Sequence, residues 1–208
     1  MKGNRTKLLR NRVAQEAALL LYTSQEKEYK QAKQRAAEIL GARILPSNFE
    51  VAEELERITE EREGSERLNR LLEMRKIALK LMKELRESNP VLIGSVWRGS
   101  PREGSDIDIV LYHEAPEEIA GQLSQEIVEV EKKVFTVNGL PRTSTHINLQ
   151  IKGYPIEIVV RSPIDREYYV DERCDTYGDS KKGLKLNELE RLMRTNPLRR
   201  FIPKRRSR

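Results

Sequence analysis

The sequence predicts an α+β protein: a mixed, mostly antiparallel sheet with helices on one face, preceded by an all-helical N-terminal region. The prediction rests on two features of the chain. Before residues 88–90, apolar side chains recur at helical spacing, whereas short apolar runs bounded by turn residues follow that point. In the second part, predicted strands first alternate with helices and then follow one another directly, which is typical of a mixed sheet with helices against one face.

The N-terminal region carries four predicted helices. Apolar residues recur every three or four positions over residues 9–20 and 29–39, which indicates two amphipathic helices. A third helix is expected to begin at Ser47, because a serine followed three residues later by Glu50 forms a capping-box pattern. The fourth is expected from about residue 65 to residue 87, directly before the first strand.

Four apolar runs predict the strands of the sheet, at residues 91–93, 107–112, 147–151 and 156–160. The last two are joined through Lys152-Gly153, which indicates a hairpin. Between the second and third runs a helix is expected from Pro116, because one helical face carries Ile119, Leu123, Ile127 and Val130. A further strand is expected at residues 134–137.

Two acidic residues, Asp106 and Asp108, stand at the start of the second predicted strand. Side chains alternate between the faces of a strand, so both carboxylates should project to one side and the isoleucines between and after them to the other. Two like charges this close repel, and each is pushed toward protonation unless a cation lies between them. Magnesium typically takes one or two carboxylates together with substrate phosphates, so the pair predicts a magnesium site.

The residues before this pair predict a phosphate site. Gly94 follows the first strand directly, and a glycine lets the backbone approach a ligand closely. The next amide groups, with the Ser95 hydroxyl, would point at an anion from the start of a short helix. Arg98 lies about one helical turn further on, and its guanidinium would donate to phosphate oxygens. A surface position for Arg98, or a pairing with Asp106, is the alternative.

Together the two segments resemble the signature of the DNA polymerase beta-like nucleotidyltransferase superfamily, in the compact form of archaeal-type CCA-adding enzymes and minimal nucleotidyltransferases. The resemblance rests on Gly94-Ser95-x-x-Arg98-Gly99-Ser100 followed by Gly104-Ser105-Asp106-Ile107-Asp108, and it covers about residues 88–161. It implies transfer of a nucleoside monophosphate from an NTP to a hydroxyl, with release of pyrophosphate. It also implies that Asp106 and Asp108 bind two Mg²⁺ ions, with Mn²⁺ as an alternative, and that the nucleotide is held by Gly94, Ser95, Arg98 and Ser105.

The family pattern also calls for a third acid on a later strand. Glu157 is the candidate, because it is the single charge in the otherwise apolar run at residues 155–160. The resemblance implies that Glu157 joins the two aspartates around the metal ions, although many members carry aspartate there. A solvent-exposed charge on an edge strand is the alternative.

The resemblance also implies where the catalytic domain begins, because a helix commonly precedes the first strand of this fold and packs on the sheet. We expect a helical region at residues 1–64, a catalytic domain at residues 65–165 and a C-terminal extension at residues 166–208.

Length and composition favour a small cytoplasmic enzyme. The chain has 208 residues and one cysteine, Cys174, so it can form no internal disulfide and fits a reducing compartment. No apolar run approaches the roughly 20 residues that cross a bilayer, and no membrane association is expected. His113 and His146 have no second histidine or cysteine at metal-ligand spacing, which favours structural or exposed positions for both.

Basic residues gather at the C-terminus. Residues 181–208 hold eleven Lys or Arg against two Glu, a net charge of +9, whereas the rest of the chain carries −3. Such a segment binds nucleic-acid phosphates without sequence preference, so an RNA 3′ end is the favoured acceptor. A solvated tail is the alternative. Two other functions stay open: a nucleic-acid-binding module without activity, and transfer of the nucleotide to a protein hydroxyl or a small molecule.

Overall fold

The computed structural model describes residues 2–123, 127–137, 139–169 and 173–203. The chain divides into two compact units, one formed by residues 1–67 with 174–179 and the other by residues 68–173 with 180–208. We refer to them as the helical unit and the sheet unit. The three-region division expected from the sequence stays a prediction.

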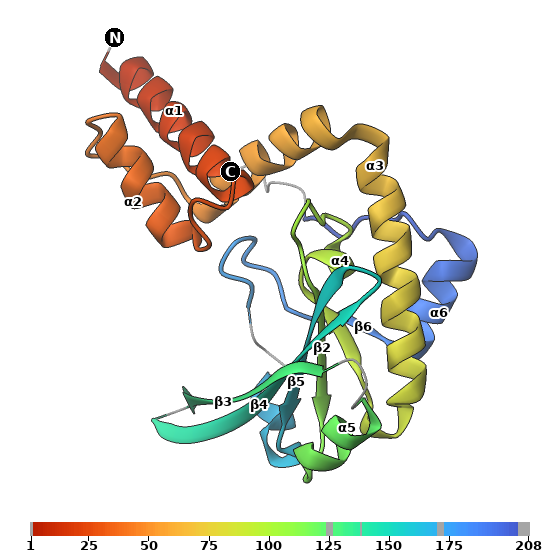
Figure 1. Cartoon of the computed structure of the whole chain (residues 1–208). Coiled ribbons are helices and arrows are strands. Elements are labelled where there is room, and N and C mark those ends of the chain that lie inside the picture. The colour runs from red at the N-terminus through yellow and green to blue at the C-terminus, as the bar shows by residue number, and fades with distance from the viewer. Residues whose placement is uncertain (1, 124–126, 138, 170–172, 204–208) are drawn as a thin grey trace. The chain divides into compact units, whose positions relative to one another are not determined.

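The helical unit contains α1 (Lys2–Tyr22), α2 (Tyr29–Ile39) and the first part of α3 (Asn48–Glu84) (Figure 1). The predicted capping box is confirmed, since the Ser47 N–H donates to Glu50 Oε2 at 2.7 Å and the Glu50 N–H donates to Ser47 Oγ at 3.2 Å. In the described residues, no helix is both long enough and apolar enough to cross a membrane.

α3 joins the third and fourth predicted helices into one element with a kink. Its backbone leaves helical geometry at Gly64, where φ is +48°. Glycine reaches this conformation without the steric cost that a side chain would add. The helical part of α3 ends at Glu84, and the residues expected to extend it to position 87 instead form the 3-10 helix η1 (Arg86–Ser88).

The sheet unit holds one six-stranded sheet in the order β3-β4-β5-β2-β1-β6. β2 and β5 pair in parallel, and the other four pairs are antiparallel, so the sheet is mixed and mostly antiparallel as predicted. The strands are β1 (Val91–Ile93), β2 (Ile107–Tyr112), β3 (Ile127–Val137), β4 (Leu140–Ile151), β5 (Tyr154–Arg161) and β6 (Leu184–Lys185).

One face of this sheet is covered by helices. The second part of α3, α5 (Pro116–Gln122) and α6 (Leu186–Thr195) share a buried apolar core with the strands, and Figure 1 shows α6 running beside α3. From β2 this core takes the side chains of Ile107, Ile109 and Leu111. The shorter helical elements are α4 (Gly94–Arg98) and η2 (Pro163–Tyr169). The opposite face is therefore the one that carries the acidic side chains of β2.

The helix expected from Pro116 to Val130 is wrong in its second half. α5 ends at Gln122, and residues 127–137 form β3, which pairs with β4 along its length. Valines favour the extended backbone, and pairing with β4 satisfies backbone hydrogen bonds of β3. The apolar residues that indicated a helix over this stretch belong to a strand instead. Some of the valines of this strand, among them Val128 and Val134, are exposed.

Candidate active site

The Gly94 turn lies directly against Asp108. In the antiparallel pair of β1 and β2, Ile93 is the partner of Asp108, so the turn that follows Ile93 passes over this carboxylate. Gly94 has φ +67°, and a Cβ atom built on it would collide with the Asp108 side chain. Position 94 therefore requires glycine for two reasons, the backbone conformation and the close approach to a carboxylate.

The sheet brings the third acid to the same place. In the parallel pair of β2 and β5, Glu157 is the partner of Asp108, and Asp106 stands one residue before β2. The alternation expected from the sequence holds, because Ile107 and Ile109 between and after the two aspartates are fully buried on the helix-covered face. Asp106, Asp108 and Glu157 thus share the face of the sheet opposite that covered by α3, α5 and α6.

The three carboxylates affect one another electrostatically. Burial raises the pKa of Asp108 to about 7, and the negative charges of Asp106 and Glu157 add to this effect. Without a cation, the Asp108 carboxyl is therefore partly protonated at neutral pH. A bound cation would remove the repulsion and favour the ionised form, which is the behaviour expected of metal-binding carboxylates.

The donor set fits magnesium by its chemistry, since it consists of carboxylate oxygens. As the side chains stand, no three His, Cys, Asp or Glu side chains in the described residues enclose an ion, so binding requires the carboxylates to converge. Glu157 is held to one side by its own partners. Its Oε1 accepts a hydrogen bond from His146 Nδ1 at 2.7 Å and lies 3.5 Å from Lys133 Nζ, and a carboxylate can still bind a metal through its other oxygen.

His146 is a site residue that the sequence prediction missed. It lies on β4 two residues from Asn148, the partner of Glu157, so its side chain stands on the acidic face. An ionised carboxylate only accepts hydrogen bonds, so Nδ1 carries the proton, and Nε2 contacts the Ser144 hydroxyl at 2.9 Å. The strand register decides this contact, and the spacing of histidines along the chain carries no sign of it.

The two predicted serines have different environments. The Ser95 hydroxyl is buried and has no hydrogen-bond partner within the described residues, which makes it available to an anionic ligand. The Ser105 hydroxyl accepts a hydrogen bond from the Arg102 N–H at 3.0 Å, so it shapes the loop that leads into Asp106. A nucleotide contact for either serine stays a prediction.

Arg98 is buried with 5% of its surface exposed, and its guanidinium contacts the C-terminal part of the chain. Nη1 donates to the Phe201 carbonyl at 3.0 Å, and the guanidinium lies over the Trp97 ring at 4.4 Å from the centroid. These contacts favour a structural role over the predicted contact with a triphosphate, which stays untested.

A pocket of about 380 Å³ opens beside two of the acids. It is bordered by the side chains of β4 and β5 and has amide groups as well as carboxylates on its wall. Its lining residues are Asp106, Val128, Asn148, Leu149, Gln150, Pro155, Ile156 and Glu157. The acidic face therefore offers room for a substrate next to the carboxylates.

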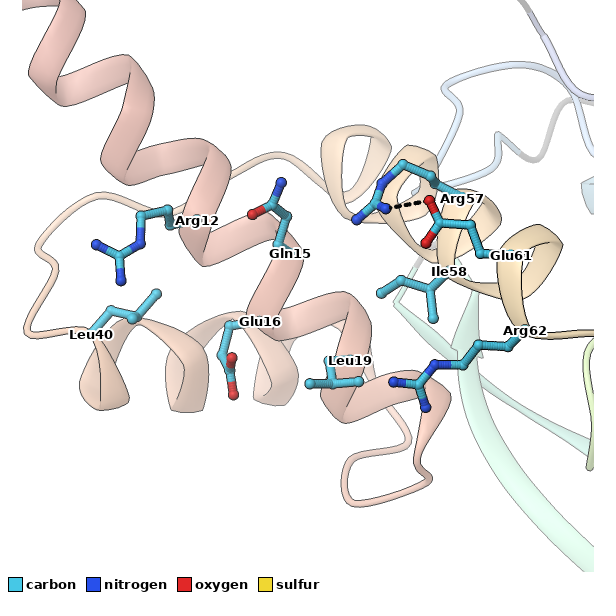
Figure 2. A pocket seen from close by; sticks show the side chains of 9 residues that line it. All are labelled: Arg12, Gln15, Glu16, Leu19, Leu40, Arg57, Ile58, Glu61 and Arg62. Atoms are coloured by element: carbon cyan, nitrogen blue, oxygen red, sulfur yellow. Dashed lines mark hydrogen bonds and ion pairs between the residues drawn. The ribbon is translucent and has the colours of Figure 1, made fainter.

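A second pocket, of about 390 Å³, lies within the helical unit (Figure 2). Leu19, Leu40 and Ile58 contribute apolar surface, and two of the charged residues that line it form an ion pair. Arg57 contacts Glu61 at 2.7 Å and Glu54 at 3.0 Å, as the dashed line in Figure 2 marks for Glu61. The residues that line this pocket do not include three carboxylates like those on the sheet, so it is not a second candidate for the same chemistry.

Comparison with known proteins agrees with the geometry. The family model described as nucleotidyltransferase domain matches residues 73–177, half of the chain. The chain belongs to this nucleotidyltransferase family. The match includes every predicted site residue, from Gly94 to Glu157, and it agrees with the resemblance to the DNA polymerase beta-like superfamily. A search of curated proteins found no match.

Membership of the nucleotidyltransferase family supports transfer of a nucleoside monophosphate from an NTP, a reaction that in this family generally depends on a divalent metal. The acidic face described above lies within the residues that the family model matches. The family match ends at residue 177, so β6, α6 and the segment that contacts Arg98 lie beyond it.

Proposed function

We propose that the protein is a magnesium-dependent nucleotidyltransferase that moves a nucleoside monophosphate from an NTP to a hydroxyl acceptor, with an RNA 3′ end as the favoured acceptor. One observation carries the proposal. Asp106, Asp108 and Glu157 share one face of the sheet, and the Gly94 turn lies against the central carboxylate.

The proposed reaction breaks one bond and forms another at the α-phosphorus of the NTP. The acceptor hydroxyl gives up its proton to water, its oxygen attacks that phosphorus, and the bond to the bridging oxygen breaks, so that pyrophosphate leaves with that oxygen. The amides after Gly94 and the unpaired Ser95 hydroxyl would orient the triphosphate, which limits its motion before the attack. Mg²⁺, or Mn²⁺ in its place, would be held by Asp106, Asp108 and Glu157 and would supply charge neutralisation and a more acidic acceptor hydroxyl.

His146 and Lys133 would support this arrangement through Glu157. Both contact the same oxygen of that carboxylate, and the Ser144 hydroxyl in turn contacts the imidazole. Partners of this kind fix the orientation of a metal-binding carboxylate and tune its basicity. Glu157 is one methylene longer than an aspartate would be, so it has more conformers to restrict, and a fixed partner is correspondingly more important.

The choice of RNA as acceptor rests on the C-terminal charge. Residues 181–208 carry a net charge of +9, which attracts a polyanion. A protein hydroxyl is the second candidate acceptor. Binding of nucleic acid without catalysis is the competing function, and the three acids on one face argue against it, because a silent domain does not need them.

The deciding experiment offers each of the four NTPs, labelled at the α-phosphate, with Mg²⁺ or Mn²⁺ to total RNA and to total protein of the source cell. Label transferred to RNA supports the proposal, and label transferred to protein moves the acceptor to a protein hydroxyl. The control is the double variant D106N/D108N, which keeps the shape of both side chains. Transfer of label by this variant, or no transfer by the wild type to either substrate, would contradict the proposal.

A further inference from the structure

Residues 183–203, which we call the C-terminal clamp, contact the β1–α4 segment at both of its ends. At the edge of the sheet, β6 pairs with β1, with Lys185 opposite Val91 and Leu184 opposite Leu92. Gly183 has φ +65° and sits so close to Val91 and Leu92 that a side chain there would meet both. β1, the strand that leads into Gly94, is therefore an inner strand of the sheet because the C-terminal clamp pairs with its outer edge.

The end of the clamp crosses the other end of α4. The Phe201 N–H donates to the Arg98 carbonyl at 2.8 Å, and Arg98 Nη1 donates back to the Phe201 carbonyl at 3.0 Å. Gly99 has φ +75°, and a Cβ atom there would lie 2.9 Å from the Arg199 carbonyl oxygen and 3.1 Å from Arg200 Cα. The clamp thus lies directly on the turn that ends α4.

Arg75, in the core of the sheet unit, contacts both α4 and the C-terminal clamp. Its fully buried guanidinium donates to three backbone carbonyls, those of Val96 at 3.1 Å, Trp97 at 3.0 Å and Pro197 at 2.6 Å. Burial lowers its pKa to about 10, which leaves the group charged at neutral pH. A buried charge is costly unless hydrogen bonds compensate it, and here the compensating carbonyls belong to α4 and to the clamp.

We infer that the C-terminal clamp is part of the nucleotide site and holds Gly94 and Ser95 against Asp108, with Arg75 and Arg98 as positioning residues. The inference rests on the proposed function, because it takes the Gly94–Ser95 turn as the element that binds the triphosphate. α4 has five residues, and a helix this short does not keep its geometry without contacts from outside. The clamp lies beyond the residues that the family model matches.

The test uses a pair of glycine variants of the full chain. Gly99→Ala pushes a methyl group into the clamp, and Gly153→Ala is the control, because Gly153 has a similar φ of +82° but nothing within 4 Å. Both variants place a side chain at a residue with positive φ, but only Gly99→Ala also displaces the clamp. The measurements are amide hydrogen exchange over residues 94–100 and binding of the α,β-methylene analogues of ATP, CTP, GTP and UTP with Mg²⁺.

For Gly99→Ala we expect exchange over residues 94–100 to accelerate at least about tenfold and affinity for the analogue to fall about tenfold to a hundredfold, since small misplacements of binding groups have effects of that size. Gly153→Ala should retain wild-type values of both. Equal behaviour of the two variants would overturn the inference.

A measurement on the wild type covers the case in which Gly99→Ala does not fold. Coupling between two sites is reciprocal, so a bound analogue should also slow exchange of the Phe201 amide. Protection of residues 94–100 with no change at Phe201 would overturn the inference. If the wild type responds to none of the analogues, the proposed function has failed, and the exchange comparison of the two glycine variants alone decides whether the clamp holds α4.

Discussion

Asp108 is the side chain on which the candidate site depends most. It is the partner of Ile93 on one side and of Glu157 on the other, so it stands between the glycine turn and the third acid. Burial, together with the negative charges of Asp106 and Glu157, makes its ionised form unfavourable in the absence of a cation. The effects expected from single substitutions follow from this position.

Replacing Asp106 or Asp108 by Asn should keep the fold and lower nucleotide transfer by at least about a hundredfold, because substitutions of residues that merely support metal ligands already cost 10- to 100-fold. Transfer of labelled nucleotide under saturating Mg²⁺ measures the effect. Glu114→Gln is the matched control, since this exposed acid lies beyond the other end of β2. Wild-type turnover in either aspartate variant would contradict the proposal that this aspartate binds the metal.

The raised pKa of Asp108 predicts a pH dependence of stability in the metal-free protein. A carboxyl group with a folded-state pKa near 7 and an ordinary pKa of 3.8 when unfolded binds its proton more tightly in the folded state. Its contribution is fully present below pH 3.8 and is lost as the pH rises through 7. In EDTA, Asp108→Asn should therefore be more stable than the wild type at pH 8, by about 1–3 kcal/mol.

Denaturant unfolding at pH 5 and pH 8 checks this prediction. The advantage of the Asn variant should be larger at pH 8 than at pH 5. An advantage that does not change with pH would mean that Asp108 titrates normally in the folded protein.

His146→Ala should lower transfer by about 10- to 100-fold, the usual effect of removing a partner of a metal ligand, and should raise the Mg²⁺ concentration needed for half-maximal activity. His146→Gln should retain part of the activity, because an amide can still donate to Glu157. His113→Ala is the control, since its imidazole contacts the Ala115 backbone instead of an acid of the site. An unchanged Mg²⁺ requirement in His146→Ala would show that Glu157 does not depend on this partner.

Among the elements, α4 is the one whose position matters most for the candidate site. It is also too short to keep its geometry without contacts from other elements. Its first residues face Asp108, and its last residues contact Arg75 and the C-terminal clamp. Arg98 belongs to this second end of the helix by its observed contacts.

Arg98→Ala separates the two interpretations of that side chain. Loss of the bond to the Phe201 carbonyl should lower the free energy of unfolding by about 1–3 kcal/mol, because a partly buried carbonyl loses a charged hydrogen-bond donor. NTP affinity should fall together with it. Denaturant unfolding and titration with an NTP analogue measure the two quantities, and weaker affinity at unchanged stability would favour a direct phosphate contact instead.

For the molecule as a whole, the basic C-terminus has two parts with different environments. Residues 197–203 are bound to α4 and Arg75, whereas Lys204, Arg205, Arg206 and Arg208 lie outside the described residues. Removing all residues from Leu198 onward would therefore disturb the Gly94–Ser95 turn as well as remove the basic charges of the C-terminus. A chain that ends at Pro203 removes the four basic residues and leaves the clamp complete.

The chain that ends at Pro203 should bind RNA more weakly than the full chain, and the slope of log affinity against log salt should fall by about 0.7 for each RNA phosphate that the shorter chain no longer neutralises. NTP affinity should not change. RNA binding by both chains across a salt series checks this, with analogue binding as the control. Identical slopes would show that these residues do not bind RNA and would favour a protein hydroxyl as the acceptor.

The sequence by itself determined the fold class, the strands β1 and β2 and the turn into α4, because these depend on local patterns, whereas the roles of the three acids stay predictions. Alternation along β2 places Asp106 and Asp108 on one face wherever the strand lies. The capping box at Ser47 and the hairpin turn at Lys152-Gly153 are equally local, and both are present in the structure.

Only the tertiary structure decided which distant residues meet. The parallel register of β2 and β5 places Glu157 beside Asp108, and the register of β4 brings His146 to Glu157. In β3, backbone pairing with the next strand, β4, took the place of the helix that the apolar spacing indicated. Arg98 was expected to face a phosphate but donates to Phe201, more than a hundred residues away. Strand pairing and the compensation of buried charge depend on partners remote in sequence, and local periodicity carries no information about them.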